Sequence, residues 1–162
     1  MTTYFEDIVV GEEHVLGSHT FTADEIIAFA TKYDPQPFHL SEEAAAKSQF
    51  GQLCASGWHT AAMFMRLSVD MAKARKAAAL ERGEAIAEGG PSPGFEDLKW
   101  LRPVYVGDTI TYKRVISEKI ESKSRPQWGV VRSENHGFNQ NGEPVFFFKS
   151  AVFVERRPRP SD

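Results

Sequence analysis

The stretch SGWHTAAMFMRLSVDMAKARKAAALERG, residues 56–83, is the most informative helix candidate in the chain. From Trp58 to Leu67, apolar residues stand on nearly every side of the predicted helix. A helix that lies on one face of a sheet needs only a single apolar stripe, so this pattern predicts a helix buried on most sides. Beyond Asp70 the sequence turns polar, and there we expect the helix to emerge into solvent.

The chain that follows this helix predicts antiparallel strands. WGVVRSENHGF (128–138) and PVFFFKSAVFV (144–154) flank an Asn-Gly pair at 141–142, which is a strong hairpin signal. An extended segment near 95–101 and the stretch TITYKRVISEKI (109–120) supply two further strand candidates. In the last predicted strand, apolar side chains occur on both faces, so we expect the strand to be covered on both faces or to lie at an interface.

The chain before the long helix predicts an arm and two shorter helices. YFEDIVVGEE (4–13) indicates a strand or strand-like arm. In FTADEIIAFATKYD (21–34), Thr22 and Glu25 have the spacing of a capping box, and Pro35 should end the helix at the residue before it. SEEAAAKS (41–48) indicates a brief helix capped by its first serine. Helices followed by a run of antiparallel strands favour an α+β fold, with a sheet wrapped on the long central helix.

Length and composition favour one soluble globular domain. The 162 residues suit a single domain, 1–162, with residues 83–94 as a loop and residues 155–162 as a frayed tail. A hydrophobic content of 41% with 25% charged residues argues against disorder. The net charge of −3 gives no field that favours nucleic acid or an anionic membrane. Neither is expected as a partner.

Cysteine content and motifs narrow the setting further. The one cysteine, Cys54, excludes an internal disulfide framework, and neither a secretory signal nor an apolar run of ~20 residues is visible. The sequence therefore predicts a cytoplasmic protein. His14, His19 and His136 show no metal-ligand spacing, and no phosphate loop or dinucleotide fingerprint is found. We expect no metal and no cofactor.

A stiff segment, YDPQPFHLSEEAA (33–45), contains the first candidates for chemistry. Asp34 and His39 lie five positions apart with Pro35 and Pro37 between them. An acid–base pair works only when it is held in position, and prolines supply stiffness. A fully extended path would separate the two Cα atoms by about 15 Å, so a turn is required to bring the side chains together. The residues alone leave two interpretations open: an ordinary helix-terminating turn, or a rigid mount for acid–base catalysis.

This segment resembles the hydratase 2 motif of the MaoC-like dehydratases, written G-D-x-N-P-x-H. Asp34, Pro37 and His39 match the motif in place, whereas Tyr33 stands where Gly is usual and Gln36 where Asn is usual. ASGWHTAAM (55–63) resembles the start of the family's central helix, and FEDLKWLRPVYVGDTI (95–110) resembles its next strand, corner and strand. The resemblance covers residues 4–154 in order.

The resemblance implies a hot-dog fold, a homodimer with a continuous sheet, and reversible hydration of trans-2-enoyl-CoA to (3R)-hydroxyacyl-CoA. It implies that Asp34 and His39 hold the water and exchange protons with it and with C2. A glycine at the position of Gly57 would supply an amide for the developing charge on the thioester oxygen; the alternative is that this glycine only permits tight packing. The residues expected to line the substrate site are Gln36, Ser56, Trp58 and His59.

Two other functions are compatible with the same fold. A hot-dog thioesterase would hydrolyse the C–S bond of the same class of substrate, and fold alone does not distinguish it from a hydratase. A non-catalytic protein that binds acyl thioesters is the second alternative, because Tyr33 and Gln36 depart from the motif. A thiol nucleophile at Cys54 is a weaker candidate, since a lone cysteine in this setting more often packs.

Overall fold

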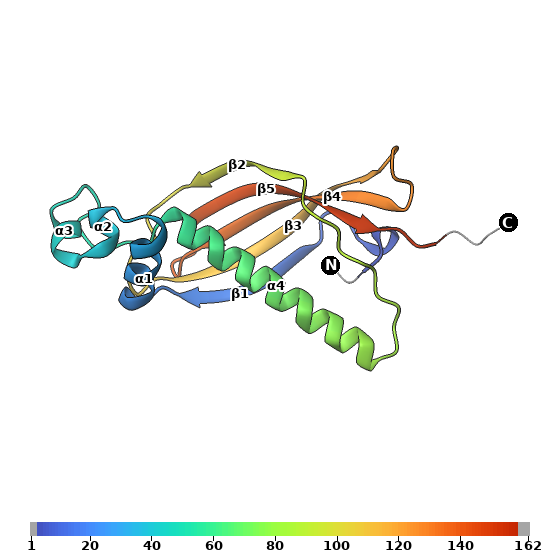
Figure 1. Cartoon of the computed structure of the whole chain (residues 1–162), viewed down its shortest axis with the longest axis horizontal. Helices are drawn as coiled ribbons and strands as arrows, with labels where there is room; N and C mark the ends of the chain where they lie inside the picture. The colour runs from blue at the N-terminus through green and yellow to red at the C-terminus, as the bar shows by residue number, and fades with distance from the viewer. Residues whose placement is uncertain (1–2, 159–162) are drawn as a thin grey trace.

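The computed structural model describes residues 3–158, in which one long helix lies across a five-stranded antiparallel sheet (Figure 1). The elements are η1 (Phe5–Asp7), β1 (Glu13–Thr20), α1 (Ala23–Tyr33), α2 (Pro37–Leu40), α3 (Glu42–Ala46), α4 (Gly57–Glu81), β2 (Gly94–Trp100), β3 (Thr109–Glu121), β4 (Trp128–Phe138) and β5 (Pro144–Glu155). The strands are ordered β1-β3-β4-β5-β2, which leaves β1 and β2 at the edges. This arrangement is the hot-dog fold, and the predicted α+β class is confirmed.

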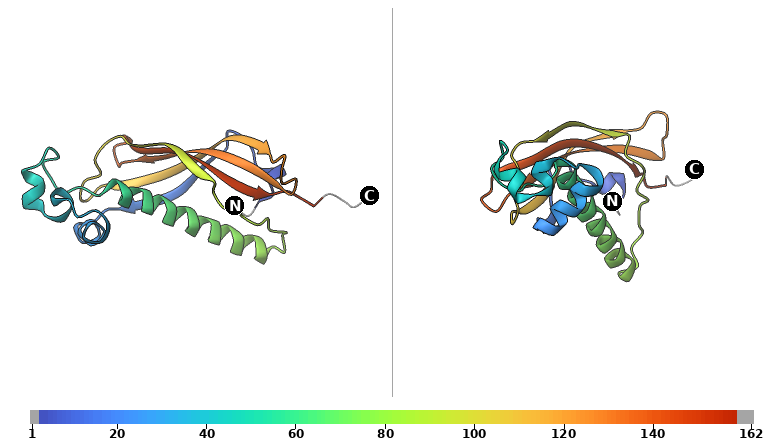
Figure 2. Two further views of the ribbon diagram at one scale, coloured as in Figure 1. Left: turned by 45° about the horizontal axis from the view of Figure 1, so that its top comes forward. Right: turned by 60° about the vertical axis from the view of Figure 1, so that its left-hand side comes forward.

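The first half of α4 packs on the sheet and forms the centre of the core. Phe64 is buried against the aromatic side chains of the sheet, and the Tyr112 hydroxyl donates a hydrogen bond of 2.9 Å to the carbonyl of Thr60. The buried residues of this cluster are Leu16, Phe21, Ile26, Ala45, Leu53, Ala55, Phe64, Val104, Ile110, Tyr112, Val145 and Phe146. The C-terminal half of α4 diverges from the sheet (Figure 2).

The prediction that α4 is buried on most sides is wrong for the single chain. Trp58, Met65 and Val69 are 53%, 56% and 41% exposed, respectively. The sheet covers only one side of α4 (Figure 2), so the apolar residues on the other side face outward. The helix therefore has two apolar surfaces, and the sheet covers one of them.

The N-terminal segment differs from the predicted strand-like arm. It forms the short helix η1, whose Phe5 packs with Ile8 in a second buried cluster together with Ile116, Val131 and Val154. Pairing starts only at β1, after a turn at Gly11, where φ is +89°. The sequence pattern did not indicate β1, because a register shift between Val15 and Gly17 interrupts its alternation of inward and outward residues.

The local signals before α4 are confirmed. The capping box of Thr22 and Glu25 is present at the start of α1, and Ser41 caps α3 by accepting a hydrogen bond from the amide of Ala44. α1 ends at Tyr33, before Pro35. A further one-turn helix, α2, begins at Pro37 and supplies the turn that the sequence required but did not specify.

The first two residues after β5, which belong to the predicted tail, form ion pairs with the rest of the protein. The Arg156 guanidinium pairs with Glu121 and Glu6, and Arg157 pairs with Asp7. Residues 159–162 of that predicted tail lie outside the described residues. Within residues 3–158, no helix has the length and apolar character needed to cross a bilayer.

Candidate active site

The structure brings Asp34 and His39 together at one end of α4. Asp34 is the C-cap of α1, and α2 turns the chain so that His39 Nε2 lies 3.5 Å from Asp34 Oδ2. Both side chains are largely withdrawn from solvent, at 18% and 7% exposed, respectively. The stiff segment between α1 and α2 thus acts as a mount for an acid and an imidazole that face each other.

A backbone carbonyl determines which nitrogen of His39 carries a proton. His39 Nδ1 lies 2.6 Å from the carbonyl oxygen of Cys54. A carbonyl only accepts hydrogen bonds, so Nδ1 must donate its hydrogen there. In the neutral ring this leaves Nε2, the nitrogen nearer Asp34, with a lone pair. Two acceptors, Nε2 and a carboxylate oxygen, therefore lie 3.5 Å apart, and a water molecule placed beside both can donate one hydrogen to each.

The carboxylate of Asp34 is held by two donors. Ser56 Oγ donates to Oδ2 at 2.6 Å, and Gln36 Nε2 donates to Oδ1 at 2.8 Å. Burial opposes ionisation, but these two hydrogen bonds and the nearby His39 outweigh it and lower the pKa of Asp34. The acid is therefore charged near neutral pH. Gln36, expected to line the substrate site, bonds the carboxylate from the position where the motif usually has Asn, and it also lines the hollow beside this pair.

Ser56 and Gly57 connect this pair to the start of α4. Ser56 is the N-cap, as predicted, and its Oγ accepts from the amide of Trp58 while donating to Asp34. Gly57 begins the helix, and no acceptor among the described residues takes its N–H. A Cβ on Gly57 would lie 2.3 Å from the Trp100 indole, so the packing requires glycine. The free amide and the close packing occur at the same residue.

These groups open into an apolar hollow of about 420 Å³. Asp34, His39 and Gly57 lie in its wall, and Arg102 is the one cation among its lining residues. The apolar lining consists of Phe38, Phe50, Ala55, Trp58, Trp100, Leu101, Pro103, Val104 and Val145. Trp58 lines the hollow as predicted and meets Trp100 edge to face, with ring centroids 5.1 Å apart. The wall residues from the β2–β3 corner were not predicted, since nothing local in the sequence marks them as lining residues.

His59 does not line this hollow, so its predicted place in the substrate site is wrong. Successive residues of a helix point in different directions, and the His59 ring is directed toward α1, where it stacks on Phe29 with centroids 4.6 Å apart. It is buried, and its Nδ1 has no partner among the described residues. Burial lowers the pKa of His59 to about 4; the neighbouring His19 adds to this effect and Glu25 opposes it.

Neither a thiolate nor a cluster of metal ligands is formed by the described part of the chain. Burial raises the pKa of the Cys54 thiol to about 11, so the thiol is protonated and unsuited to nucleophilic attack. Residues 3–158 contain no group of three His, Cys, Asp or Glu side chains that could hold a metal ion. The chemistry that this site supports is acid–base chemistry on a ligand with an apolar part.

Comparisons with known proteins show which family the chain resembles. The family model described as "MaoC like domain" matches residues 9–136. A crystal structure of a MaoC-like dehydratase from Rhodospirillum rubrum is similar, with 37% identity, a TM-score of 0.79, and coverage of 97% of this chain and 99% of that one.

Two curated proteins are also similar along most of their length. The 3-hydroxybutyryl-CoA dehydratase of Methylorubrum extorquens is 28% identical over 147 residues, covering 88% of this chain and 82% of that protein. The uncharacterized protein YdeM of Bacillus subtilis is 25% identical over 152 residues, covering 93% of this chain and 98% of that protein.

Proposed function

The chain belongs to the MaoC-like dehydratase family, and on this premise we propose that it catalyses the reversible hydration of a trans-2-enoyl-CoA to a (3R)-hydroxyacyl-CoA. The observation that carries the proposal is the 3.5 Å separation of Asp34 Oδ2 and His39 Nε2 beside an apolar hollow and an unengaged helix-start amide. The similar 3-hydroxybutyryl-CoA dehydratase supports the thioester substrate class. The (3R) configuration is proposed from the resemblance to hydratase 2 enzymes.

In the proposed reaction, Asp34 and His39 together hold one water molecule. The carboxylate and the Nε2 lone pair each accept one of its hydrogens, which directs a lone pair of the water oxygen toward C3 of the enoyl group. As the oxygen adds to C3, one of the two groups takes a proton from the water, and C2 receives a proton from the pair. One water is consumed, and the reverse dehydration releases it. The role of base is assigned to Asp34 and His39 as a pair.

Gly57 supplies the third component. Addition at C3 pushes electron density onto the thioester oxygen, and the free Gly57 N–H at the start of the 25-residue helix α4 suits that charge. Gly57 lines the hollow, and the Trp100 indole occupies the space that a side chain at this residue would need. A preorganised donor of this kind accelerates the reaction because it need not reorient as the charge develops.

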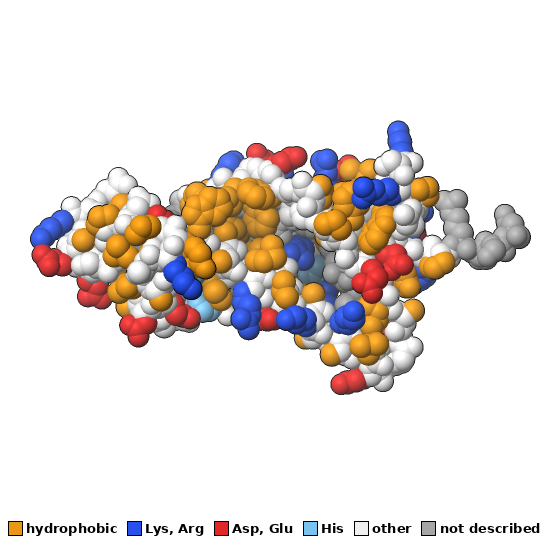
Figure 3. All heavy atoms as spheres, in the orientation of Figure 1, with side chains coloured by type: hydrophobic (Ala, Val, Ile, Leu, Met, Phe, Trp, Pro, Cys, Tyr) orange, Lys and Arg blue, Asp and Glu red, His pale blue; other side chains and the backbone are white. Residues whose placement is uncertain are grey.

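We also propose that the protein acts as a homodimer. Six exposed apolar residues form a strip along one side of α4 and the edge strand β2: Trp58, Met65, Val69, Phe95, Trp100 and Leu101. Hydrophobic side chains gather over β2 and the adjoining half of α4 in Figure 3. The outer edge of β2 has no pairing strand among the described residues, so a second copy can both continue the sheet and cover the apolar strip.

The proposed reaction is tested with a panel of trans-2-enoyl-CoA substrates in heavy water. Loss of the conjugated-enoyl absorbance and release of free thiol are followed together, and the products are analysed by mass spectrometry and NMR. We expect reversible hydration, deuterium at C2, a (3R) product and negligible free thiol. Thiol release without a 3-hydroxyacyl product would instead identify a thioesterase. Saturable binding without turnover would identify an acyl-thioester-binding protein.

A further inference from the structure

A second group of basic side chains lies far from Asp34 and His39, where α4 separates from the sheet. Arg114 on β3 reaches under the helix, and its Nη2 donates to Ser68 Oγ at 2.7 Å. Ser68 is twelve residues beyond Ser56, which places it about 18 Å along the helix axis from the proposed catalytic site. The two regions are thus separate sites on one helix.

Arg114 is partly buried and has no acidic partner among the described residues. Its Nε donates to Asn135 Oδ1 at 3.1 Å, and its guanidinium lies over the Phe64 ring, 5.5 Å from the centroid. Among residues 3–158, no carboxylate pairs with it and no acceptor is bonded to its Nη1. Burial and the charge of Arg75 lower the pKa of Arg114 to about 10. A partly buried guanidinium that keeps unengaged donors and has no counter-ion is suited to bind an anion.

The buried network behind Arg114 holds it in place. Asn135 is fully buried, and its Nδ2 donates to Ser150 Oγ at 2.9 Å and lies within bonding distance of the Phe148 carbonyl. These bonds orient Oδ1 toward Arg114 Nε. The guanidinium is thus preorganised, and its remaining donors are left for a ligand.

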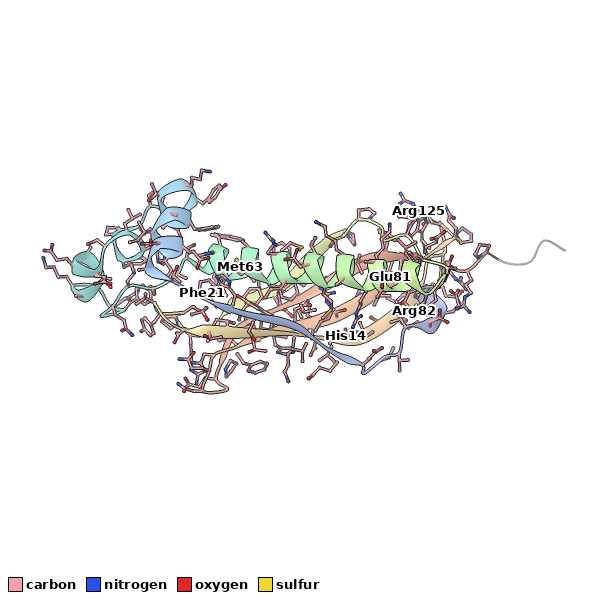
Figure 4. The ribbon with its side chains drawn as sticks, turned by 90° about the horizontal axis from the view of Figure 1, so that it is seen from below. His14, Phe21, Met63, Glu81, Arg82 and Arg125 are labelled. Atoms are coloured by element: carbon pink, nitrogen blue, oxygen red, sulfur yellow. The ribbon has the colours of Figure 1, made fainter. Side chains whose placement is uncertain are left out.

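The side chains of Arg75 and His14 lie close to Arg114. Arg75 on α4 has its Nη2 3.1 Å from His14 Nδ1 on β1, and the described residues give Arg75 no carboxylate partner. Burial, then the charges of Arg75 and Arg114, lower the pKa of His14, and Glu12 opposes this. Figure 4 shows His14 beside α4, between Met63 and Arg82 along the helix axis.

These side chains wall a hollow of about 190 Å³ between α4, β1, β3 and η1. The space-filling view shows a hollow near the middle of this face, with basic and histidine side chains in it (Figure 3). Two carboxylates also line it: Glu12, 3.6 Å from His14 Nδ1, and Asp7, which pairs with Arg157. A wider hollow of about 630 Å³ shares Arg75 and both carboxylates with it and therefore adjoins it.

We propose that the hollow walled by Arg114, Arg75 and His14 binds a small oxyanion, either a phosphate group or a carboxylate. A guanidinium offers parallel N–H donors that match two oxygens of either group. The size of the hollow suits such a group, whereas the adjoining wider hollow leaves room for the rest of a larger molecule. Neither Glu12 nor Asp7 pairs with Arg75 or Arg114, so the charges of these two guanidinium groups remain available for a ligand.

The experiment is calorimetric titration of the full-length protein with inorganic phosphate and, separately, with acetate, at constant ionic strength maintained with chloride. We expect saturable binding of at least one of them; stronger binding of phosphate identifies a phosphoryl site, and the reverse a carboxylate site. Arg75→Gln should weaken binding about tenfold or more, because a charge-assisted hydrogen bond is lost. Arg66→Gln is the matched control, since Arg66 is on the same helix but pairs with Asp70.

A second measurement locates the anion and does not depend on a variant that folds poorly. In the wild-type protein, the bound anion should raise the pKa of His14, followed by NMR, whereas the NMR signals of the Phe147 ring on β5 should not move when the anion is added. The proposal is overturned if neither anion binds above chloride, if Arg75→Gln binds as tightly as the wild type, or if the pKa of His14 does not move. Hydration of enoyl-CoA is measured in parallel. Failure of hydration would not contradict anion binding, and failure of anion binding would not contradict hydration, because the two sites are at different places along α4.

Discussion

Ser56 Oγ donates a 2.6 Å hydrogen bond to Asp34 Oδ2 and at the same time accepts from the amide of Trp58. One hydroxyl therefore caps the long helix α4 and fixes the acid at the end of α1. The start of the helix and the position of the carboxylate are coupled, so the site geometry depends on the same hydroxyl that caps the N-terminus of α4.

Ser56→Ala should raise the pKa of Asp34 and shift the acid limb of the pH–rate profile to higher pH, because a donor to the ionised form is lost. Loss of the helix cap should also cost about 1 kcal/mol of unfolding free energy. Ser41→Ala is the matched control, since Ser41 caps α3 without touching Asp34. Equal pH–rate profiles for the two variants would show that Ser56 acts only as a cap.

Asp34→Asn and His39→Ala should each reduce hydration of enoyl-CoA by ~10²–10⁴-fold, which is the usual effect of removing a positioned proton-transfer group. Circular dichroism and thermal unfolding establish whether the variants remain folded. His136→Ala on β4, outside the hollow, is the control and should retain activity. Near wild-type hydration by folded Asp34→Asn and His39→Ala would exclude this pair as the catalytic centre.

Gly57→Ala should destabilise the protein by about 1–3 kcal/mol, because the new methyl group would overlap the Trp100 indole. The same overlap should lower the hydration rate by displacing the helix-start amide. The double variant Gly57→Ala/Trp100→Ala removes the overlapping ring, so its loss of unfolding free energy should be smaller than the sum of the losses in the two single variants. Strict additivity in urea unfolding would contradict a direct contact between the two residues.

Stability should fall as the pH drops from about 6.5 toward 4, because His59 is held neutral in the fold. Its folded pKa, about 4, lies below the ordinary value of 6.5, so the unfolded chain binds a proton in this range and the folded chain does not. The loss approaches roughly 3 kcal/mol at the lower end of the range. Urea unfolding at several pH values measures it, and His59→Phe should remove this part of the pH dependence while other groups keep theirs.

The protein should be a dimer by light scattering at low micromolar concentration. Met65→Glu places a charge in the apolar strip and should shift the protein toward the monomer. Val15→Glu is the matched control: Val15 is similarly exposed but lies on β1, at the opposite edge of the sheet from β2. A wild-type protein that remains monomeric at these concentrations would contradict the proposed dimer.

Local signals in the sequence were sufficient for much of the framework. The capping box of Thr22 and Glu25, the end of α1 before Pro35 and the hairpin at 141–142 all depend on backbone sterics and bonds within a few residues. The strands of that hairpin match their predicted bounds to within a residue because they carry dense apolar and β-branched sequence. Asp34 and His39 were found through their motif, which is also local.

Contacts between distant parts of the chain were decided by the tertiary structure alone. The bond from Ser56 to Asp34 joins residues 22 positions apart, and that from Arg114 to Ser68 joins residues 46 apart. Whether such pairs meet depends on strand register and on the direction in which α4 crosses the sheet, which no short window of sequence encodes. For the same reason His59, adjacent to Trp58 in sequence, points toward α1 and not into the hollow. The packing of Trp100 on Gly57 likewise exists only because β2 is brought alongside the start of α4.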